Sequence, residues 1–173
     1  MQFPHTYFED EIREGFYITG AMKRAWAAQL EVLEEIDKVC KKHNIRWFAD
    51  CGTLLGAVRH GGYIPWDDDM DICMLRPDYI KFNQVAEQEL PKSFVVLNMH
   101  KEELYLEYMT RVTNGHRLNF DSNYLEKYHD CPYATGIDIF VLDYIAEDEE
   151  EEKERKALAT LIMAAAVSYT HLR

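Results

Sequence analysis

The spacing of apolar and polar positions predicts a chain of alternating helices and strands. Apolar residues recur at every third or fourth position from Ala21 to His43, which is typical of a helix that buries one face. A second long helix is predicted over 76–89, where Pro77 suits the first turn. A third helix is expected to begin near Glu147, and a short one is expected over 54–58.

Runs of β-branched and aromatic residues predict strands between these helices. The predicted strands cover 45–51, 70–75, 94–99, 104–112 and 136–142. Asn114-Gly115 is a hairpin turn signal, so a further short strand is expected at 117–120, followed by a loop over 121–135. The order of these elements indicates an α+β fold class, with a mixed β-sheet flanked by helices.

The length of the chain fits one domain with terminal extensions. Residues 1–19 are interpreted as an N-terminal arm, 20–146 as the core and 147–173 as a C-terminal helix. We expect the chain to be a truncated fragment, with a foreign tail at 168–173, because no closing strand or cap follows the Ala-rich stretch.

Composition and charge narrow the class of protein. The 173 residues are 47% hydrophobic, which is enough for a packed core. Acidic residues outnumber basic ones 31 to 19, and the net charge of −12 argues against a nucleic acid partner. No signal peptide pattern and no membrane-spanning apolar stretch is evident, so a cytoplasmic protein is expected. The four cysteines form no C-x-x-C pair and are expected to be free thiols.

A dense carboxylate cluster is the main candidate for chemistry. Four of the six residues from Asp67 to Ile72 are Asp. Alternation along a strand would place Asp69 and Asp71 on one face, with Asp68 pointing elsewhere. Two such carboxylates can hold a divalent cation, and Mg²⁺ or Mn²⁺ is the expected cofactor. The alternative of a solvated acidic turn stays open, whereas an EF-hand loop does not fit because its Gly and Glu positions are not matched.

A small-residue turn precedes this cluster. Gly52 and Thr53 follow a predicted strand and open a helix, so their backbone N–H groups and the Thr53 hydroxyl could hold a phosphate. A purely capping role is the alternative. Arg59 and His60 lie between this turn and the carboxylates, where they could contact a phosphate, although a structural role for His60 is at least as plausible.

Asp138 interrupts an otherwise apolar strand and therefore needs a partner. It could form a structural pair with an Arg. It could also be the third carboxylate of the metal site, or the base that activates a hydroxyl, and the site is favoured. Arg111 is either a rim salt bridge or a contact for the substrate.

The order of these motifs, with a small-residue turn, two Asp and a later third Asp, indicates a nucleotidyltransferase-type fold. The string from Leu54 to His60 and from Tyr63 to Ile72 closely resembles the LicD family. The segment Ile137–Asp143 resembles that family's downstream motif, and the resemblance covers roughly residues 20–145.

The resemblance implies transfer of phosphocholine, or a related phospho-alcohol, from a CDP-linked donor onto a cell-surface glycan such as teichoic acid or lipopolysaccharide. By motif position, Asp69, Asp71 and Asp138 would bind the metal and act in catalysis. The residues that would bind substrate are Gly52, Thr53, Arg59, His60, Asp67 and Arg111. The expected location is the cytoplasm, where peripheral contact with a membrane-linked acceptor at the inner face of the membrane is compatible with the family's chemistry.

Two other functions remain open from the sequence. A glycosyltransferase could use Asp-x-Asp and a metal to hold a nucleotide-sugar. A binding module could have kept the fold without activity. A glycosyltransferase would hydrolyse UDP-sugars, whereas the family's activity predicts hydrolysis of CDP-alcohols. A binding module without activity would show no binding of Mg²⁺ or Mn²⁺ by calorimetry.

Overall fold

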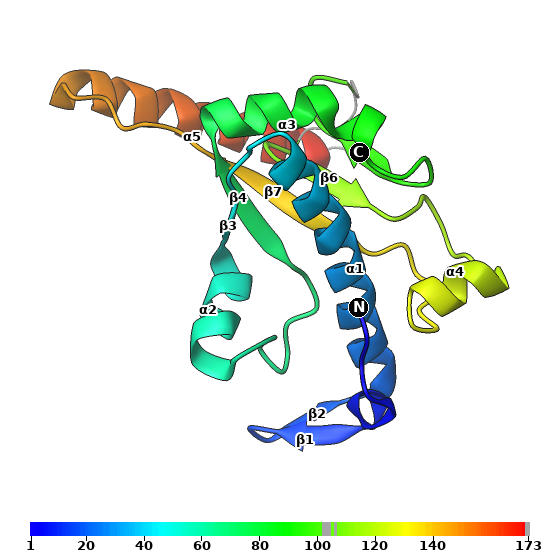
Figure 1. Cartoon of the computed structure of the whole chain (residues 1–173). Coiled ribbons are helices and arrows are strands. Elements are labelled where there is room, and N and C mark those ends of the chain that lie inside the picture. The colour runs from blue at the N-terminus through cyan, green and yellow to red at the C-terminus, as the bar shows by residue number, and fades with distance from the viewer. Residues whose placement is uncertain (102–104, 106, 172–173) are drawn as a thin grey trace.

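The computed structural model describes residues 1–101, 105 and 107–171, with side chains described up to 165. Its centre is a mixed five-stranded sheet in the order β3–β4–β7–β6–β5 (Figure 1). These strands are β3 (Phe48–Ala49), β4 (Asp71–Leu75), β5 (Val95–Leu97), β6 (Thr110–Thr113) and β7 (Gly136–Leu142). Only β4 and β7 run parallel, and the other neighbours are antiparallel. The predicted α+β class is confirmed.

Two long helices supply the apolar layer that covers one face of the sheet. They are α1 (Gly20–Lys42) and α3 (Arg76–Glu89). Residues such as Ile36 of α1 and Phe82 of α3 share one core cluster with Ile72, Ile137 and Ile139 of the strands. Successive side chains of a strand alternate between faces. Asp71, which precedes Ile72, and Asp138, which lies between Ile137 and Ile139, therefore belong to the opposite face.

The strongest periodic patterns gave the correct elements. The predicted helices over 21–43 and 76–89 correspond to α1 and α3, and the predicted strands over 70–75 and 136–142 correspond to β4 and β7. The Thr19 hydroxyl accepts a hydrogen bond from the Met22 N–H at 3.1 Å, which caps the start of α1. Burial of one face against the sheet then stabilises the helix along its length.

The segment around Gly52 differs from its prediction. The predicted strand over 45–51 is reduced to β3, and the predicted helix over 54–58 is α2 (Cys51–His60). The cause is Asp50, whose side chain accepts from the Cys51 N–H and whose carbonyl accepts from the Leu54 N–H at 2.9 Å. An Asp in this role begins a helix, so the strand cannot continue through it.

The segment after β6 also differs. The predicted strand over 104–112 is reduced to β6 (Thr110–Thr113), and positions 104 and 106 of the prediction lie outside the described residues. No hairpin follows, because 117–120 is not a strand and the predicted loop contains α4 (Ser122–Lys127). Buried Asn114 closes this connection instead: its side-chain oxygen accepts from the Thr135 N–H at 3.0 Å, and its own N–H donates to the Thr135 carbonyl at 3.1 Å. The chain thus returns directly into β7.

The two ends of the chain add further elements. The arm contains a 3₁₀ turn, η1 (His5–Phe8), and a hairpin of β1 (Glu11–Arg13) and β2 (Phe16–Ile18). At the other end α5 (Glu149–His171) is capped by Asp148, and its first part extends beyond the sheet (Figure 1). The predicted foreign tail at 168–173 falls on side chains outside the described part of the structure.

All four cysteines carry free thiols, as predicted. Within the described residues, no helix has both the length and the apolar character needed to cross a membrane.

Candidate functional site

The acidic loop, residues 67–69, is separated by one residue, Met70, from the first residue of β4. Oxygen atoms of Asp67, Asp68 and Asp69 lie within 4.8 Å of one another. The loop is not part of the strand, because β4 begins at Asp71. Burial still alternates here, with Met70 buried between the exposed Asp69 and the half-buried Asp71.

Asp71, the first residue of β4, lies beside Asp138, the third residue of β7. The register of β4 and β7 pairs Asp71 with Asp138 and Ile72 with Ile139. The two carboxylates therefore share the sheet face that is opposite the core. Residues that are sixty-seven positions apart in sequence thus meet at one point, as the sequence analysis proposed for the third carboxylate.

Arg111 of β6 is the direct partner of Asp138. Its guanidinium donates two hydrogen bonds, from Nε to Oδ1 at 2.6 Å and from Nη2 to Oδ2 at 2.7 Å. Asp138 raises the pKa of Arg111 above its ordinary value through these hydrogen bonds, so the guanidinium stays charged. The structural pairing that the sequence left open is present. It coexists with the position of Asp138 beside Asp71.

Electrostatic crowding marks this group of carboxylates. Burial, followed by repulsion from Asp69, Asp138, Asp67 and Asp50, raises the pKa of Asp71 to about 6. The pKa of Asp67 is raised as well, by burial and by a hydrogen bond with Asp69. Like charges so close together favour a bound cation.

The start of α2 brings Gly52 and Thr53 against the acidic residues. A Cβ atom on Gly52 would lie 2.2 Å from Oδ2 of Asp67, so only glycine lets this carboxylate approach the helix. The Thr53 hydroxyl accepts a hydrogen bond from the Asp71 N–H at 2.8 Å. Gly52 thus lies against the carboxylate of Asp67 and Thr53 against the backbone of Asp71, and contact with a donor phosphate stays a prediction.

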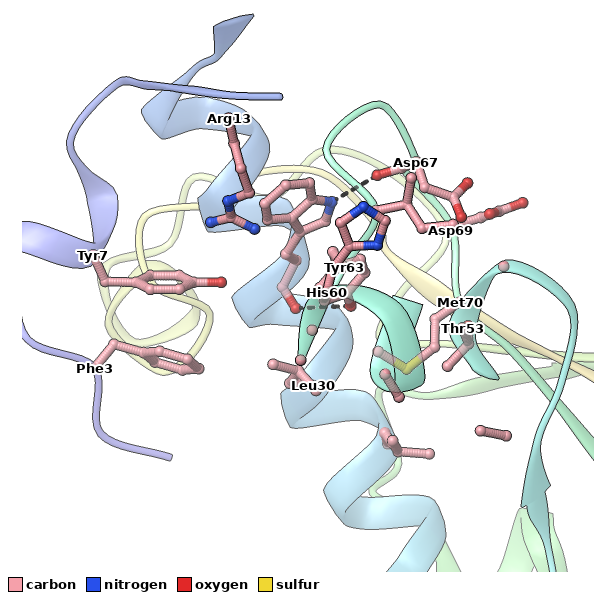
Figure 2. Close-up of a pocket in the computed structure, with 18 of the residues that line it drawn as sticks. Phe3, Tyr7, Arg13, Leu30, Thr53, His60, Tyr63, Asp67, Asp69 and Met70 are labelled. Atoms are coloured by element: carbon pink, nitrogen blue, oxygen red, sulfur yellow. Dashed lines mark hydrogen bonds between the residues drawn. The ribbon is translucent and has the colours of Figure 1, made fainter. Parts of the chain in front are cut away.

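A cavity of about 550 Å³ opens next to the acidic loop. Figure 2 shows Asp67 and Asp69 on one side of it and Phe3 and Tyr7 of the arm on the other. The residues that line it come from the arm, α1, the segment around β3, α2 and the loop that follows α2, and include Arg13, Trp26, Leu30, Gly52, Thr53, His60, Tyr63 and Met70. The cavity is therefore closed partly by a segment that the sequence analysis treated only as an arm.

Arg59 and His60 lie at the end of α2. The His60 side chain is 3% exposed and its Nε2 lies 3.1 Å from Oε2 of Glu14 in the arm. The Arg59 guanidinium lies 6.0 Å from the ring centre of Trp66, within the range of a cation–π contact. His60 thus lines the cavity and also fastens the hairpin of the arm, and its phosphate contact stays a prediction.

Two residues that contact the acidic loop escaped the sequence analysis. Trp26 and Gln29 of α1 bond the carbonyl oxygens of Asp67 and Asp68. Both positions fit the buried face of α1, so nothing in the residue pattern separates them from ordinary core residues.

The donor set suits a hard divalent cation. The candidate ligands are carboxylate oxygens, which Mg²⁺ and Mn²⁺ prefer, and burial together with repulsion from its neighbours raises the pKa of Asp71. The oxygens that lie within 4.8 Å of one another belong to Asp67, Asp68 and Asp69, so Asp71 and Asp138 are not part of that group, and the metal-binding set Asp69, Asp71 and Asp138 stays a prediction. Within the described residues, the acidic loop forms the only group of three or more potential metal-ligating side chains.

The chain thus belongs to the class of α+β proteins that place carboxylates beside the start of a helix. Comparison with known proteins assigns the family. The family described as "LicD/FKTN/FKRP, nucleotidyltransferase domain" matches residues 44–153, which is more than half of the chain. The chain therefore belongs to this family.

Three curated relatives share shorter stretches with this chain. Lipopolysaccharide cholinephosphotransferase LicD of Haemophilus influenzae is 43% identical over 60 residues, covering 35% of this chain and 23% of the relative. An uncharacterized protein of Rickettsia typhi is 43% identical over 58 residues, 34% of this chain and 19% of the relative. An uncharacterized protein of Rickettsia prowazekii is 34% identical over 87 residues, 50% of this chain and 32% of the relative. The aligned part is thus a third or less of each relative's length.

Proposed function

We propose that this chain catalyses metal-dependent transfer of phosphocholine, or a related phospho-alcohol, from a CDP-linked donor to a hydroxyl of a cell-surface glycan. One observation carries the proposal: within the family region, Asp67 and Asp69 line a cavity large enough for a small ligand, and Asp71 lies beside Asp138 and close enough to Asp69 for their charges to repel. The name of the Haemophilus relative supports phosphocholine and lipopolysaccharide as the first substrates to test.

In this proposal the chain's residues divide the work between donor and acceptor. Bound Mg²⁺ would neutralise the charge of the donor diphosphate and stabilise the leaving CMP. Asp69 and Asp71 would hold the ion, and the N–H groups at the start of α2 would face the phosphates. The cavity between α1, α2 and the arm would exclude water from the alcohol being transferred.

Asp138 is the proposed acceptor for the proton of the attacking glycan hydroxyl. A carboxylate offers about four lone-pair sites. Arg111 takes two of them and fixes the plane of the carboxylate. The remaining sites can accept the hydroxyl proton while the oxygen attacks phosphorus, and the bond from phosphorus to the CMP oxygen breaks.

The test is release of CMP from CDP-choline and CDP-ribitol, with UDP-sugars as competing donors, in Mg²⁺ and in EDTA. We expect CMP release only with Mg²⁺ or Mn²⁺. Asp69→Asn and Asp71→Asn should each reduce it by about 100-fold or more, because even an indirect partner of a metal ligand is worth about 10–100-fold.

Asp130→Asn is the matched control. Asp130 lies in a turn after α4, paired on the surface with Arg24, and its φ of 59° is one that Asn tolerates well. Near-normal turnover of either site variant, or hydrolysis of UDP-sugars in place of CDP-alcohols, would reject the proposed function.

A further inference from the structure

Two buried side chains of α1 reach the backbone of the acidic loop. Trp26 Nε1–H donates to the carbonyl oxygen of Asp67 at 2.9 Å. Gln29 Nε2–H donates to the carbonyl oxygen of Asp68 at 2.8 Å. Two consecutive carbonyls of the loop are therefore bonded to one helix.

The positions of these residues on α1 make the double contact possible. Trp26 and Gln29 are three residues apart, so they project from the same face of the helix. They are 1% and 5% exposed, so neither hydrogen bond competes with bulk water. A buried amide that found no partner would lose its hydrogen bonds to water without replacement, which destabilises the fold. Breaking the hydrogen bonds between these donors and the loop carbonyls is therefore unfavourable.

Tyr63 fixes the orientation of both donors. Its hydroxyl donates to Gln29 Oε1 at 2.9 Å, which leaves the amide NH₂ of Gln29 directed at the loop. Its ring stacks on Trp26 with centroids 4.7 Å apart and an interplanar angle of 9°. The three side chains form one bonded unit between α1 and the loop.

We propose that Trp26 and Gln29 are positioning residues that hold the acidic loop in the shape in which it binds a divalent cation. The cation itself rests on the proposed function, whereas the holding of the loop does not. Both residues lie outside 44–153, the region that matches the family.

The physical need for such anchors comes from the charges of the loop. Asp67, Asp68 and Asp69 have oxygen atoms within 4.8 Å of one another, and their repulsion would drive the loop open when no cation is bound. Anchoring the backbone at two successive carbonyls leaves only side-chain rotation as a way to relax. A site shaped in advance loses less order on binding, which strengthens binding.

The first measurement is hydrogen–deuterium exchange of the whole chain in EDTA. Gln29→Met and Trp26→Phe remove the donors while keeping most of the packing volume. In each variant, amides within 64–71 should exchange about fivefold to tenfold faster than in the wild type, as loss of one hydrogen bond allows.

Asn98→Leu is the matched control. Asn98 is 1% exposed and its amide donates to Asn83 Oδ1 at 3.1 Å, between β5 and α3 and away from the acidic loop. Its replacement removes a buried amide of the same kind. We expect a comparable fall in Tm with unchanged exchange at 64–71.

The second measurement is Mn²⁺ affinity, read from the electron paramagnetic resonance signal of the free ion. Gln29→Met and Trp26→Phe should weaken binding by about tenfold or more, and Asn98→Leu by less than about twofold. Tyr63→Phe is a milder variant that keeps the stacked ring. It should weaken binding by about twofold to threefold even if a harsher variant fails to fold.

The outcomes separate the two proposals. Unchanged exchange at 64–71 in folded Gln29→Met and Trp26→Phe would overturn the positioning role, as would Asn98→Leu matching them in exchange and Mn²⁺ affinity. Failure of the wild type to bind Mn²⁺ would overturn the proposed function and the cation-binding part of this inference, while the exchange data still decide whether the loop is held.

Discussion

The surroundings of Asp71 disfavour the ionised form of its carboxylate. Burial and repulsion from neighbouring carboxylates raise its pKa from 3.8 to about 6. Above about pH 6 the carboxylate is ionised in both the folded and the unfolded chain, so the folded state bears the full cost. Below about pH 3.8 it is protonated in both, and the cost vanishes. A group kept under these conditions is better explained by function than by stability.

We therefore expect Asp71→Asn to stabilise the metal-free protein at pH 7.5. After allowance for partial exposure, the gain is about 1 kcal/mol, which corresponds to about 2–4 °C in Tm. The gain should disappear at about pH 4. The measurement is thermal unfolding in EDTA at both pH values.

The contrasting variant is Asp143→Asn. Its partner Arg76 lowers the pKa of Asp143, so its removal should lower Tm at pH 7.5. A fall in Tm for Asp71→Asn at pH 7.5 would show that Asp71 is not under electrostatic strain.

Gly52 shows how a single hydrogen atom can decide a site. Gly52→Ala would place a methyl group 2.2 Å from Oδ2 of Asp67, and a carboxylate at the end of a side chain can swing away. The fold should therefore survive with a change in Tm of a few degrees, while the carboxylate is displaced from the loop. We expect CMP release to fall by about tenfold or more.

Gly115→Ala provides the comparison for Gly52→Ala. A Cβ atom there meets nothing within 4 Å, and no left-handed φ requires glycine. Turnover close to the wild type is expected for Gly115→Ala. If Gly52→Ala is equally active, the close approach of Asp67 has no functional meaning.

At the scale of elements, the pairing of β6 with β7 decides the surroundings of Asp138. The register sets Arg111 opposite Asp138, and the parallel pairing sets Asp71 beside it. Asp138 therefore has one positive and one negative neighbour, each fixed by the sheet. Side chains that are attached to paired strands cannot move apart without breaking the ladder.

Removing the positive neighbour should destabilise the sheet. Arg111→Met leaves Asp138 unpaired beside Asp71, and we expect a loss of about 1–3 kcal/mol in the free energy of unfolding. The double variant Arg111→Met with Asp138→Asn should recover most of that loss, because the uncompensated charge is then gone. Urea unfolding of the single and double variants measures both.

A surface pair of the same kind gives the reference for Arg111→Met. Arg46 is 70% exposed and lies 3.3 Å from Asp78, so Arg46→Met should cost less than about 1 kcal/mol. The idea that Arg111 compensates the charge of Asp138 would be wrong in two cases. One is that Arg111→Met lowers the free energy of unfolding by no more than Arg46→Met does. The other is that the double variant is no more stable than Arg111→Met alone.

Elements with a strong local pattern could be predicted from the sequence, and elements decided by a distant contact could not. The core helices and the strands β4 and β7 have periodic apolar positions that mark their buried faces. The predicted hairpin at 114–120 failed because the Asn114 side chain bonds the Thr135 backbone, twenty-one residues away. No local pattern reveals such a contact, and the usual role of Asn-Gly in hairpins outweighed it.

The candidate site follows the same division. The proximity of Asp71 and Asp138 could be predicted because a charged residue in or next to an apolar strand is conspicuous in sequence, whereas the roles of Asp69, Asp71 and Asp138 stay predictions. The anchors of the acidic loop could not, because Trp26 and Gln29 bond carbonyl oxygens 41 and 39 residues further along the chain. A backbone carbonyl carries no residue identity, so its partner leaves no trace in the sequence.

At the scale of the whole molecule, charge opposes the proposed substrate. The chain has a net charge of −12, and the CDP-alcohol donor carries a negatively charged diphosphate. The field of the protein should therefore repel the donor over distances comparable to the Debye length, about 10 Å at 0.1 M salt. Close to the site, the proposed metal ion must reverse the sign of that interaction.

This balance predicts an unusual salt dependence. At saturating Mg²⁺, kcat/KM for CDP-choline should rise by about twofold to threefold between 20 and 150 mM NaCl, because salt screens the long-range repulsion more than the contacts inside the site. The exposed acids Glu149, Glu150 and Glu151 at the start of α5 supply a control. Their joint replacement by Gln should raise kcat/KM at 20 mM NaCl and flatten the salt dependence. A fall in kcat/KM with rising salt would instead mean that local cations such as Arg13 and Arg59 govern the approach of the donor, and that net charge is a poor guide to substrate capture in this protein.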